Sequence, residues 1–186
     1  MKRVIGIAVP VMLLFGCGVS DNSSDPKTEE VSKETKKEKI SEKDYPLFVC
    51  EQIIEFTNKL DEYSNTVRQA VKGNGDLQDV LASVDELEEV LSKMESVEAP
   101  TKYEDKQKIM QEGVDEANKG LELIKDGMKQ FANGEDNQAR MQGKEKASEG
   151  AEVVKHAGNN IWTPVVKDLV SEDSTVYERA LRNKSH

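Results

Sequence analysis

Apolar residues recur every three or four positions along four long stretches of this chain, a spacing that limits each stretch to a helix with one buried face. No stretch shows the strict alternation of a half-buried strand, and no unit of about 20 to 50 residues repeats. The four stretches cover residues 45–72, 77–98, 101–131 and 136–161. Short turns separate them, and short connections make consecutive helices antiparallel neighbours. We therefore predict an all-α fold, an antiparallel up-down-up-down four-helix bundle.

Start signals support these boundaries. Asp44 is a candidate cap for the first helix, and Pro46 lies in its first turn. Asp76 follows a glycine-rich turn and is expected to cap the second helix. Thr101 followed by Glu104 is a capping-box pattern, which predicts the start of the third helix.

The C-terminal end is expected to differ from the bundle. Thr163-Pro164 follows the fourth helix and is expected to interrupt it, because proline lacks the N–H that a helix interior needs. Residues 163–186 are therefore predicted to be a tail with short helical segments. Thr175 and Glu178 form a second capping-box pattern within it.

Glycines recur with an unusual register in the third helix. Gly113, Gly120 and Gly127 lie seven residues apart, and each interior glycine costs about 1 kcal/mol relative to alanine. Packing must offset that cost, so we infer close approach of a neighbouring backbone. The fourth helix offers small residues for this contact, among them Gly143 and Gly150. The alternative is a flexible helix or a ligand groove between the third and fourth helices.

The N-terminus has the pattern of an export signal. Lys2 and Arg3 precede about a dozen mostly apolar residues, fewer than the roughly 20 that a spanning helix needs. The apolar run ends in Leu14, Phe15, Gly16 and Cys17. This ending resembles the lipobox of bacterial prolipoproteins, although Phe15 is larger than the residue usual at its position. An ordinary secretory signal with an incidental cysteine is the alternative.

The lipobox resemblance implies a domain organisation and a location. It implies that a peptidase recognises Leu14, Phe15 and Gly16, that residues 1–16 are removed, and that Cys17 carries a covalent lipid. Residues 17–43 contain few large apolar side chains, so we predict a disordered, charged tether. The bundle domain would then span residues 44–162. The protein is expected at the extracytoplasmic face of the cell membrane, held there by lipid, and a Gram-positive host is favoured.

Composition argues against several kinds of chemistry. After removal of residues 1–16 the chain carries 24 basic and 36 acidic side chains, a formal net charge of −12, which disfavours nucleic-acid binding. The acidic cluster of residues 85–89 lacks the spacing of a calcium loop and is interpreted as a solvated face. His156 lacks partners for a metal site, and Cys50 falls on an apolar stripe where a buried thiol is expected. We predict no metal, no cofactor besides the lipid, and no enzymatic activity.

Residues 97–129 resemble part of the small, functionally uncharacterised all-helical lipoproteins of Gram-positive bacteria. The resemblance is carried by Ala99-Pro100-Thr101-Lys102-Tyr103 leading into a long charged amphipathic helix, and it covers residues 44–162. It implies the location and the helical fold, and it implies no established activity.

Trp162 is the single tryptophan and ends the fourth helix. It is expected either to cap the end of the core or to serve as an exposed contact for a partner.

Three classes of function remain open. The sequence favours a non-catalytic interaction module of the cell envelope, with the membrane and an unidentified envelope protein as partners. The alternative is a lipoprotein that binds a small ligand or an ion in a groove between the third and fourth helices. An envelope hydrolase or redox enzyme would require Cys50 or His156 to be exposed in a cleft.

Overall fold

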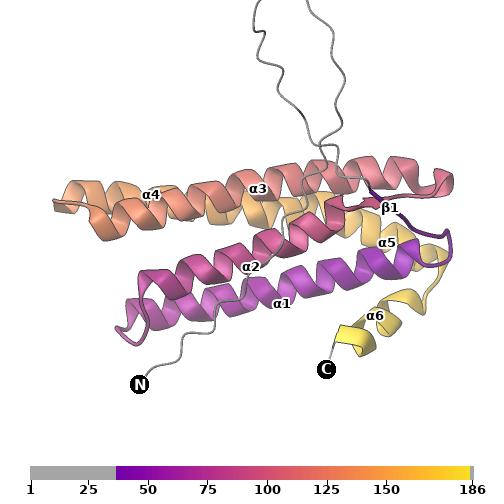
Figure 1. The fold of residues 1–186 in the computed structure, drawn as a ribbon, viewed down its shortest axis with the longest axis horizontal. Helices are drawn as coiled ribbons and strands as arrows, with labels where there is room; N and C mark the ends of the chain where they lie inside the picture. The colour runs from indigo at the N-terminus through magenta and orange to yellow at the C-terminus, as the bar shows by residue number, and fades with distance from the viewer. Residues whose placement is uncertain (1–36, 185–186) are drawn as a thin grey trace, which may run out of the picture. The chain divides into compact units, whose positions relative to one another are not determined.

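The computed structural model describes residues 37–184. Cys17, the lipobox and most of the predicted tether lie outside this range. The described residues are mostly helical, and the prediction of an all-α fold is confirmed (Figure 1). The helices are α1 (Tyr45–Val71), α2 (Leu77–Glu95), α3 (Glu104–Asn133), α4 (Asn137–His156), α5 (Thr163–Glu172) and α6 (Val176–Lys184). Two-residue strands β1 (Glu38–Lys39) and β2 (Val97–Glu98), a 3-10 turn η1 (Thr101–Tyr103) and a π-helical segment η2 (Ala157–Trp162) complete the elements.

Aspartate side chains begin α2 and α4. The Asp76 carboxylate accepts a hydrogen bond from the backbone N–H of Asp79 at 3.0 Å, and the Asp79 carboxylate accepts one from the N–H of Asp76 at 3.1 Å. Asp136 accepts from the N–H of Ala139 at 2.7 Å and caps α4 in the same way. Each cap satisfies backbone donors that a helix start leaves unpaired.

The predicted capping box at Thr101 is wrong. The chain leaves Pro100 in an extended conformation and forms η1, in which the N–H of Tyr103 donates to the Pro100 carbonyl at 2.8 Å. α3 then begins at Glu104 without a side-chain cap. The second pattern also differs, because the Thr175 hydroxyl donates to the Asp173 carboxylate at 2.7 Å.

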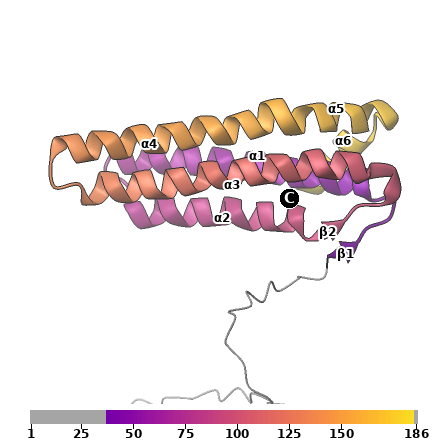
Figure 2. The same ribbon diagram turned by 90° about the horizontal axis from the view of Figure 1, so that it is seen from above.

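The predicted interruption at Thr163-Pro164 is wrong as well. Helical structure continues from α4 through η2 into α5 (Figure 2). Pro164 lies in the first turn of α5, where the missing N–H is tolerated, and the wider π turn before it gives the proline ring room. The Thr163 hydroxyl donates to the Gly158 carbonyl at 2.9 Å and satisfies one acceptor of that turn.

The helices lie lengthwise beside one another in pairs. α1 packs against α2 and α6, α2 also packs against α3, and α3 makes its most extensive contact with α4 (Figures 1 and 2). The main core gathers side chains from all of these elements except α6. Its largest fully buried members are Trp162, Tyr45, Leu87, Leu91, Leu121, Ile124 and Leu169.

The folded region also includes residues that the sequence analysis assigned to the tether. β1 pairs in parallel with β2, and the N–H of Glu38 donates to the Ser96 carbonyl at 2.8 Å. Ile40 is partly buried against the main core. Residues 38–43 therefore belong to the fold, because a single apolar side chain and a short strand pairing tie them to the end of α2.

A second, smaller apolar cluster lies on another face of α1. Cys50 and Ile54 of α1 pack against Val176 and Ala180 of α6. Partly buried Leu47 of α1 and Val166 and Val170 of α5 surround them. The predicted single stripe on the first helix is thus divided between two neighbours.

Candidate binding groove

The seam between α3 and α4 is closed by backbone. A Cβ atom added at Gly127 would lie 2.6 Å from the Gly143 carbonyl oxygen, and one at Gly120 would lie 2.7 Å from the Gly150 carbonyl oxygen. From the other side, a Cβ at Gly150 would lie 2.8 Å from the Ile124 nitrogen. Real Cβ atoms do not approach this closely, so these positions require glycine. The space that the missing side chains leave is filled by the opposite helix, so these glycines leave no room for a ligand.

Gly113 has a different neighbour from the other two glycines of its register. A Cβ atom there would collide with the indole ring of Trp162. Trp162 is only 1 % exposed, and its indole N–H donates to the Met110 carbonyl at 3.1 Å. Its ring meets that of Phe56 edge to face, with 5.1 Å between centroids. Trp162 therefore lies inside the core, and the interpretation of this residue as an exposed partner contact does not fit its burial.

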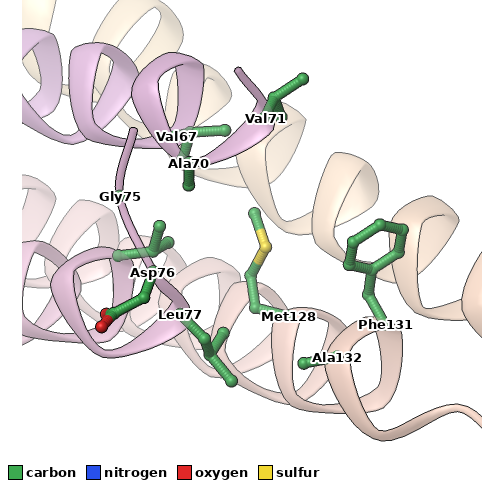
Figure 3. Close-up of a pocket in the computed structure, with 10 residues that line it drawn as sticks. Val67, Ala70, Val71, Gly75, Asp76, Leu77, Met128, Phe131 and Ala132 are labelled. Atoms are coloured by element: carbon green, nitrogen blue, oxygen red, sulfur yellow. The ribbon is translucent and has the colours of Figure 1, made fainter. Parts of the chain in front are cut away.

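An open apolar groove lies at the other end of α3. It has a volume of about 380 Å³ and is bordered by the end of α1, the beginning of α2 and the end of α3. Figure 3 shows Val67 and Ala70 on one side and Met128 opposite them. The lining is almost entirely apolar: Val67, Ala70, Val71, Gly75, Asp76, Leu77, Val80, Met128, Phe131 and Ala132. The one charged group in this lining, Asp76, is already engaged as the cap of α2.

The position of α4 leaves this groove open. α4 packs along α3, whereas the helices that contact α1 most are α2 and α6. On α1, Ile53, Leu60 and Val67 lie seven residues apart and are each only partly buried. A stripe with this spacing is typical of a helix that packs against another helix along its length. The groove lies at the end of this stripe.

Large apolar side chains remain exposed around the groove. Val71 is 83 % exposed and Phe131 is 48 % exposed. Val71 and Phe131 belong to the periodic apolar stretches 45–72 and 101–131, each of which predicts a helix with one buried face. Periodicity placed these residues on apolar helix faces. It could not indicate that the neighbouring helices would leave them uncovered.

The charge around the groove differs from that of the rest of the molecule. Residues 37–184 carry 31 acidic and 21 basic side chains. The two segments that line the groove, 67–80 and 128–132, carry two acidic and three basic side chains. These segments are therefore close to neutral within an otherwise acidic domain.

The residues considered for chemistry lie apart from the groove. Cys50 is fully buried, and burial, followed by the nearby Glu51 carboxylate, raises the pKa of its thiol to about 11. The His156 Nδ1 atom lies 2.5 Å from a carboxylate oxygen of Glu116. Within residues 37–184 no group of three or more His, Cys, Asp or Glu side chains is arranged to hold a metal ion.

Ion pairs account for much of the acidic cluster on α2. Lys125 of α3 lies 2.7 Å from Asp85 and 2.6 Å from Glu88, and Lys59 of α1 lies 3.0 Å from Glu86. These lysines join α2 to its two neighbours. The cluster thus contributes to the pairing of α2 with α1 and α3. The sequence predicted a solvated face and not this contribution.

A polar and aromatic cluster at the β1–β2 end was missed by the sequence analysis. The rings of Tyr45 and Tyr103 stack with centroids 5.0 Å apart, and the Tyr45 hydroxyl donates to Gln107 at 2.8 Å. Lys102 lies 2.9 Å from Glu172 and donates to the Tyr103 hydroxyl at 3.0 Å. Because its members are far apart in sequence and mutually paired, this cluster fastens α5 to the start of α3.

The described part of the chain is thus an all-α domain with a closed glycine seam and an open apolar groove. None of its helices combines the length and the hydrophobicity that crossing a bilayer requires. Residues 39–165 match the family described as domain of unknown function DUF7018, and the chain belongs to that family. No curated protein and no solved structure matches the chain.

Proposed function

We propose that this protein is a lipid-anchored lipoprotein of the cell envelope and a non-catalytic binding module, whose groove holds an apolar segment of another envelope protein. The lipobox pattern at Cys17 supports the anchor and the extracytoplasmic location. The groove supports binding, because it offers apolar surface without the nucleophile, acid and base that catalysis would need.

The observation that carries the proposal is the exposure of Val71 and Phe131 beside an apolar cavity. Covering a large apolar side chain contributes roughly 1.5–3 kcal/mol, so a partner that covers both gains appreciable affinity. Exposed apolar surface that is concentrated in one place is a frequent mark of an interaction site.

We further propose that α1 to α4 form an antiparallel up-down-up-down four-helix bundle, extended by α5 and α6. Short turns between consecutive helices and the pairing of α1 with α2, α2 with α3 and α3 with α4 support this topology. In this bundle the seam between α1 and α4 is the open one. A partner helix in the groove would extend into that seam.

The groove is well placed for a partner beyond the membrane surface. β1 lies beside β2 just after the end of α2, whereas the groove includes the start of α2. The 19 residues of α2 separate these points by roughly 30 Å at 1.5 Å per residue. The predicted tether therefore joins the domain at one end and the groove lies toward the other.

A small apolar ligand is the second candidate occupant. The volume of about 380 Å³ falls within the roughly 300–1,000 Å³ that is usual for ligand pockets. Ligand binding therefore remains the alternative function. The proposed ligand site is the groove between α1, α2 and α3 instead of the seam between α3 and α4.

Crosslinking in cells tests the proposal. The full lipoprotein, tagged at its C-terminus, is crosslinked and captured, and partners are identified by mass spectrometry for wild type, Val71→Asp and Phe131→Asp. Ile109→Asp is the matched control, because Ile109 is 41 % exposed on α3 but does not line the groove. We expect one dominant envelope partner whose yield falls at least about tenfold in both groove variants, the loss of about 1.4 kcal/mol or more.

Equal yields from the groove variants and the Ile109→Asp control would contradict a role of the groove in partner binding. If no partner is captured, and an apolar small molecule raises the melting temperature of wild type but not of Phe131→Asp, the ligand-binding alternative replaces the interaction module.

A further inference from the structure

The helix α6 makes limited apolar contact with the rest of the domain. Of its nine residues, Val176 and Ala180 are buried. Its other two apolar side chains, Tyr177 and Leu181, are 38 % and 41 % exposed, so the apolar contribution that holds this nine-residue helix in place is smaller than that of a core helix. Segments with few buried apolar contacts open locally at a lower free energy than the whole domain.

Polar contacts hold the last turn of α6 to α1. The Asn183 amide donates to Glu51, and the Lys184 ammonium donates to Glu55, each at 2.5 Å. Glu55 is shared, since Lys93 of α2 also lies 2.9 Å from it. Burial opposes ionisation of Glu55, but the hydrogen bonds from Lys184 and Lys93 outweigh it and lower its pKa. The Lys184 contact is a partly exposed ion pair, which salt weakens.

The cluster under α6 is separate from the main core. Cys50 and Ile54 pack with Val176 and Ala180, whereas Phe56, Tyr63 and Trp162 belong to the main core. Removal of α6 would therefore expose one face of α1 and leave the contacts among α1, α2, α3 and α4 in place.

We propose that α6 is a releasable lid, which opens without unfolding of the main core and uncovers the apolar face of α1 that contains Leu47, Cys50 and Ile54. Closed, the lid keeps this face and the Cys50 thiol away from solvent. Open, it presents an apolar helix face whose exposure depends on the Lys184–Glu55 contact and therefore on ionic strength.

Cys50 reports on this opening, because it is 0 % exposed under the closed lid. The experiment measures the rate at which a maleimide labels Cys50 in the native full chain, with the Cys50 peptide quantified by mass spectrometry so that Cys17 does not interfere. Lys184→Glu replaces the attraction to Glu55 by repulsion, and Ala180→Glu places a charge in the buried contact. Arg182→Glu is the matched control, since it makes the same charge change at an exposed position two residues away.

We expect Lys184→Glu and Ala180→Glu to label at least about tenfold faster than wild type, and Arg182→Glu to stay within about twofold of it. Added salt should speed labelling of wild type, because it screens the attraction between Lys184 and Glu55, and slow labelling of Lys184→Glu, because it screens the repulsion. The rate should depend on urea far less steeply than global unfolding does, because opening of the lid exposes little surface.

Two results would overturn the lid. One is a labelling rate of Lys184→Glu equal to that of wild type. Because position 184 lies outside the main core, this variant is expected to stay folded. The other is a wild-type rate that follows urea as steeply as global unfolding, which would show that Cys50 becomes accessible only when the whole domain unfolds.

Discussion

Gly113, Gly120 and Gly127 share one register, yet they make room for different groups. Gly120 and Gly127 admit the backbone of α4, and Gly113 admits the ring of Trp162. In each case a methyl group would occupy space that another atom already fills. The cost of an interior glycine is thus offset either by close helix contact or by a buried indole with a satisfied N–H.

Gly127→Ala tests the close contact. Alanine favours the helix by about 1 kcal/mol, but its methyl group would force α3 and α4 apart, and overpacking of this kind costs about 1–3 kcal/mol or more. We expect a net decrease in the free energy of unfolding, measured by urea denaturation. Gly158→Ala is the control, because a Cβ there meets no atom within 4 Å, and its stability should stay unchanged or rise. Equal effects of the two substitutions would refute the requirement for glycine at position 127.

The raised pKa of the Cys50 thiol predicts how the unfolding free energy changes at alkaline pH. Its pKa is raised from about 9 to about 11 in the folded state, so between these values the unfolded chain loses a proton that the folded chain retains. The contribution of this thiol to the unfolding free energy is fully present below pH 9 and is lost as the pH rises toward 11. Between these values the unfolding free energy falls by up to about 1.4 kcal/mol per pH unit.

Cys50→Ala removes this titration. We expect the unfolding free energy of the variant to fall less steeply than that of wild type between pH 9 and 11, although its value at pH 7 is lower because of the missing sulfur. Tyr45 and Tyr63 remain in both proteins, and burial raises the pKa of each hydroxyl, so their contribution to alkaline destabilisation cancels in the comparison. Parallel pH profiles would contradict the assignment to Cys50.

At the scale of elements, the close contact of α3 with α4 and the open groove have a common cause. A helix held against its neighbour by backbone contact at Gly120 and Gly127 lies nearer to that neighbour than bulky side chains would allow. α4 therefore lies close along α3, and Ile53, Leu60 and Val67 of α1 remain only partly buried. In the proposed bundle these residues would lie on the seam that α4 leaves open.

The continuation of α4 into α5 decides where Trp162 lies. Because η2 widens the helix instead of ending it, Trp162 stays on the helix and turns into the core beside Phe56 and Gly113. Had the chain turned away at Thr163-Pro164, the indole would have stood at a helix end. Proline does disfavour the interior of a regular α-helix, but the wider π turn before Pro164 accommodates its ring without ending the helix.

At the scale of the whole molecule, the proposed lipid anchor would determine where the groove operates. Cys17→Ala removes the proposed lipid acceptor. We expect the variant to move from the membrane pellet to the soluble fraction of fractionated cells, because stable anchoring requires two acyl chains and the variant would carry none. The helical content by circular dichroism should be unchanged. Membrane retention of the variant equal to that of wild type would contradict lipid anchoring through Cys17.

Local patterns were sufficient for the helices and several of their ends. Periodicity and turn residues located α1 to α4 to within a few residues, and Asp76 was identified as the cap of α2 from its position alone. These features depend on residues near one another in the sequence, whose geometry a helix sets by itself. The same reasoning failed at Thr101, where a preceding proline favoured a 3-10 turn.

Sequence by itself thus determined that the chain is helical, where its long helices run and that its glycines need close neighbours. Only the tertiary structure decided which neighbours these are: α4 for Gly120 and Gly127, the Trp162 ring for Gly113, and α6 for Cys50. It also decided that Val71 and Phe131, placed on apolar faces, remain uncovered beside the groove. The physical reason is that periodicity specifies the face a helix must bury, whereas the partner that covers it depends on packing between residues far apart in the chain.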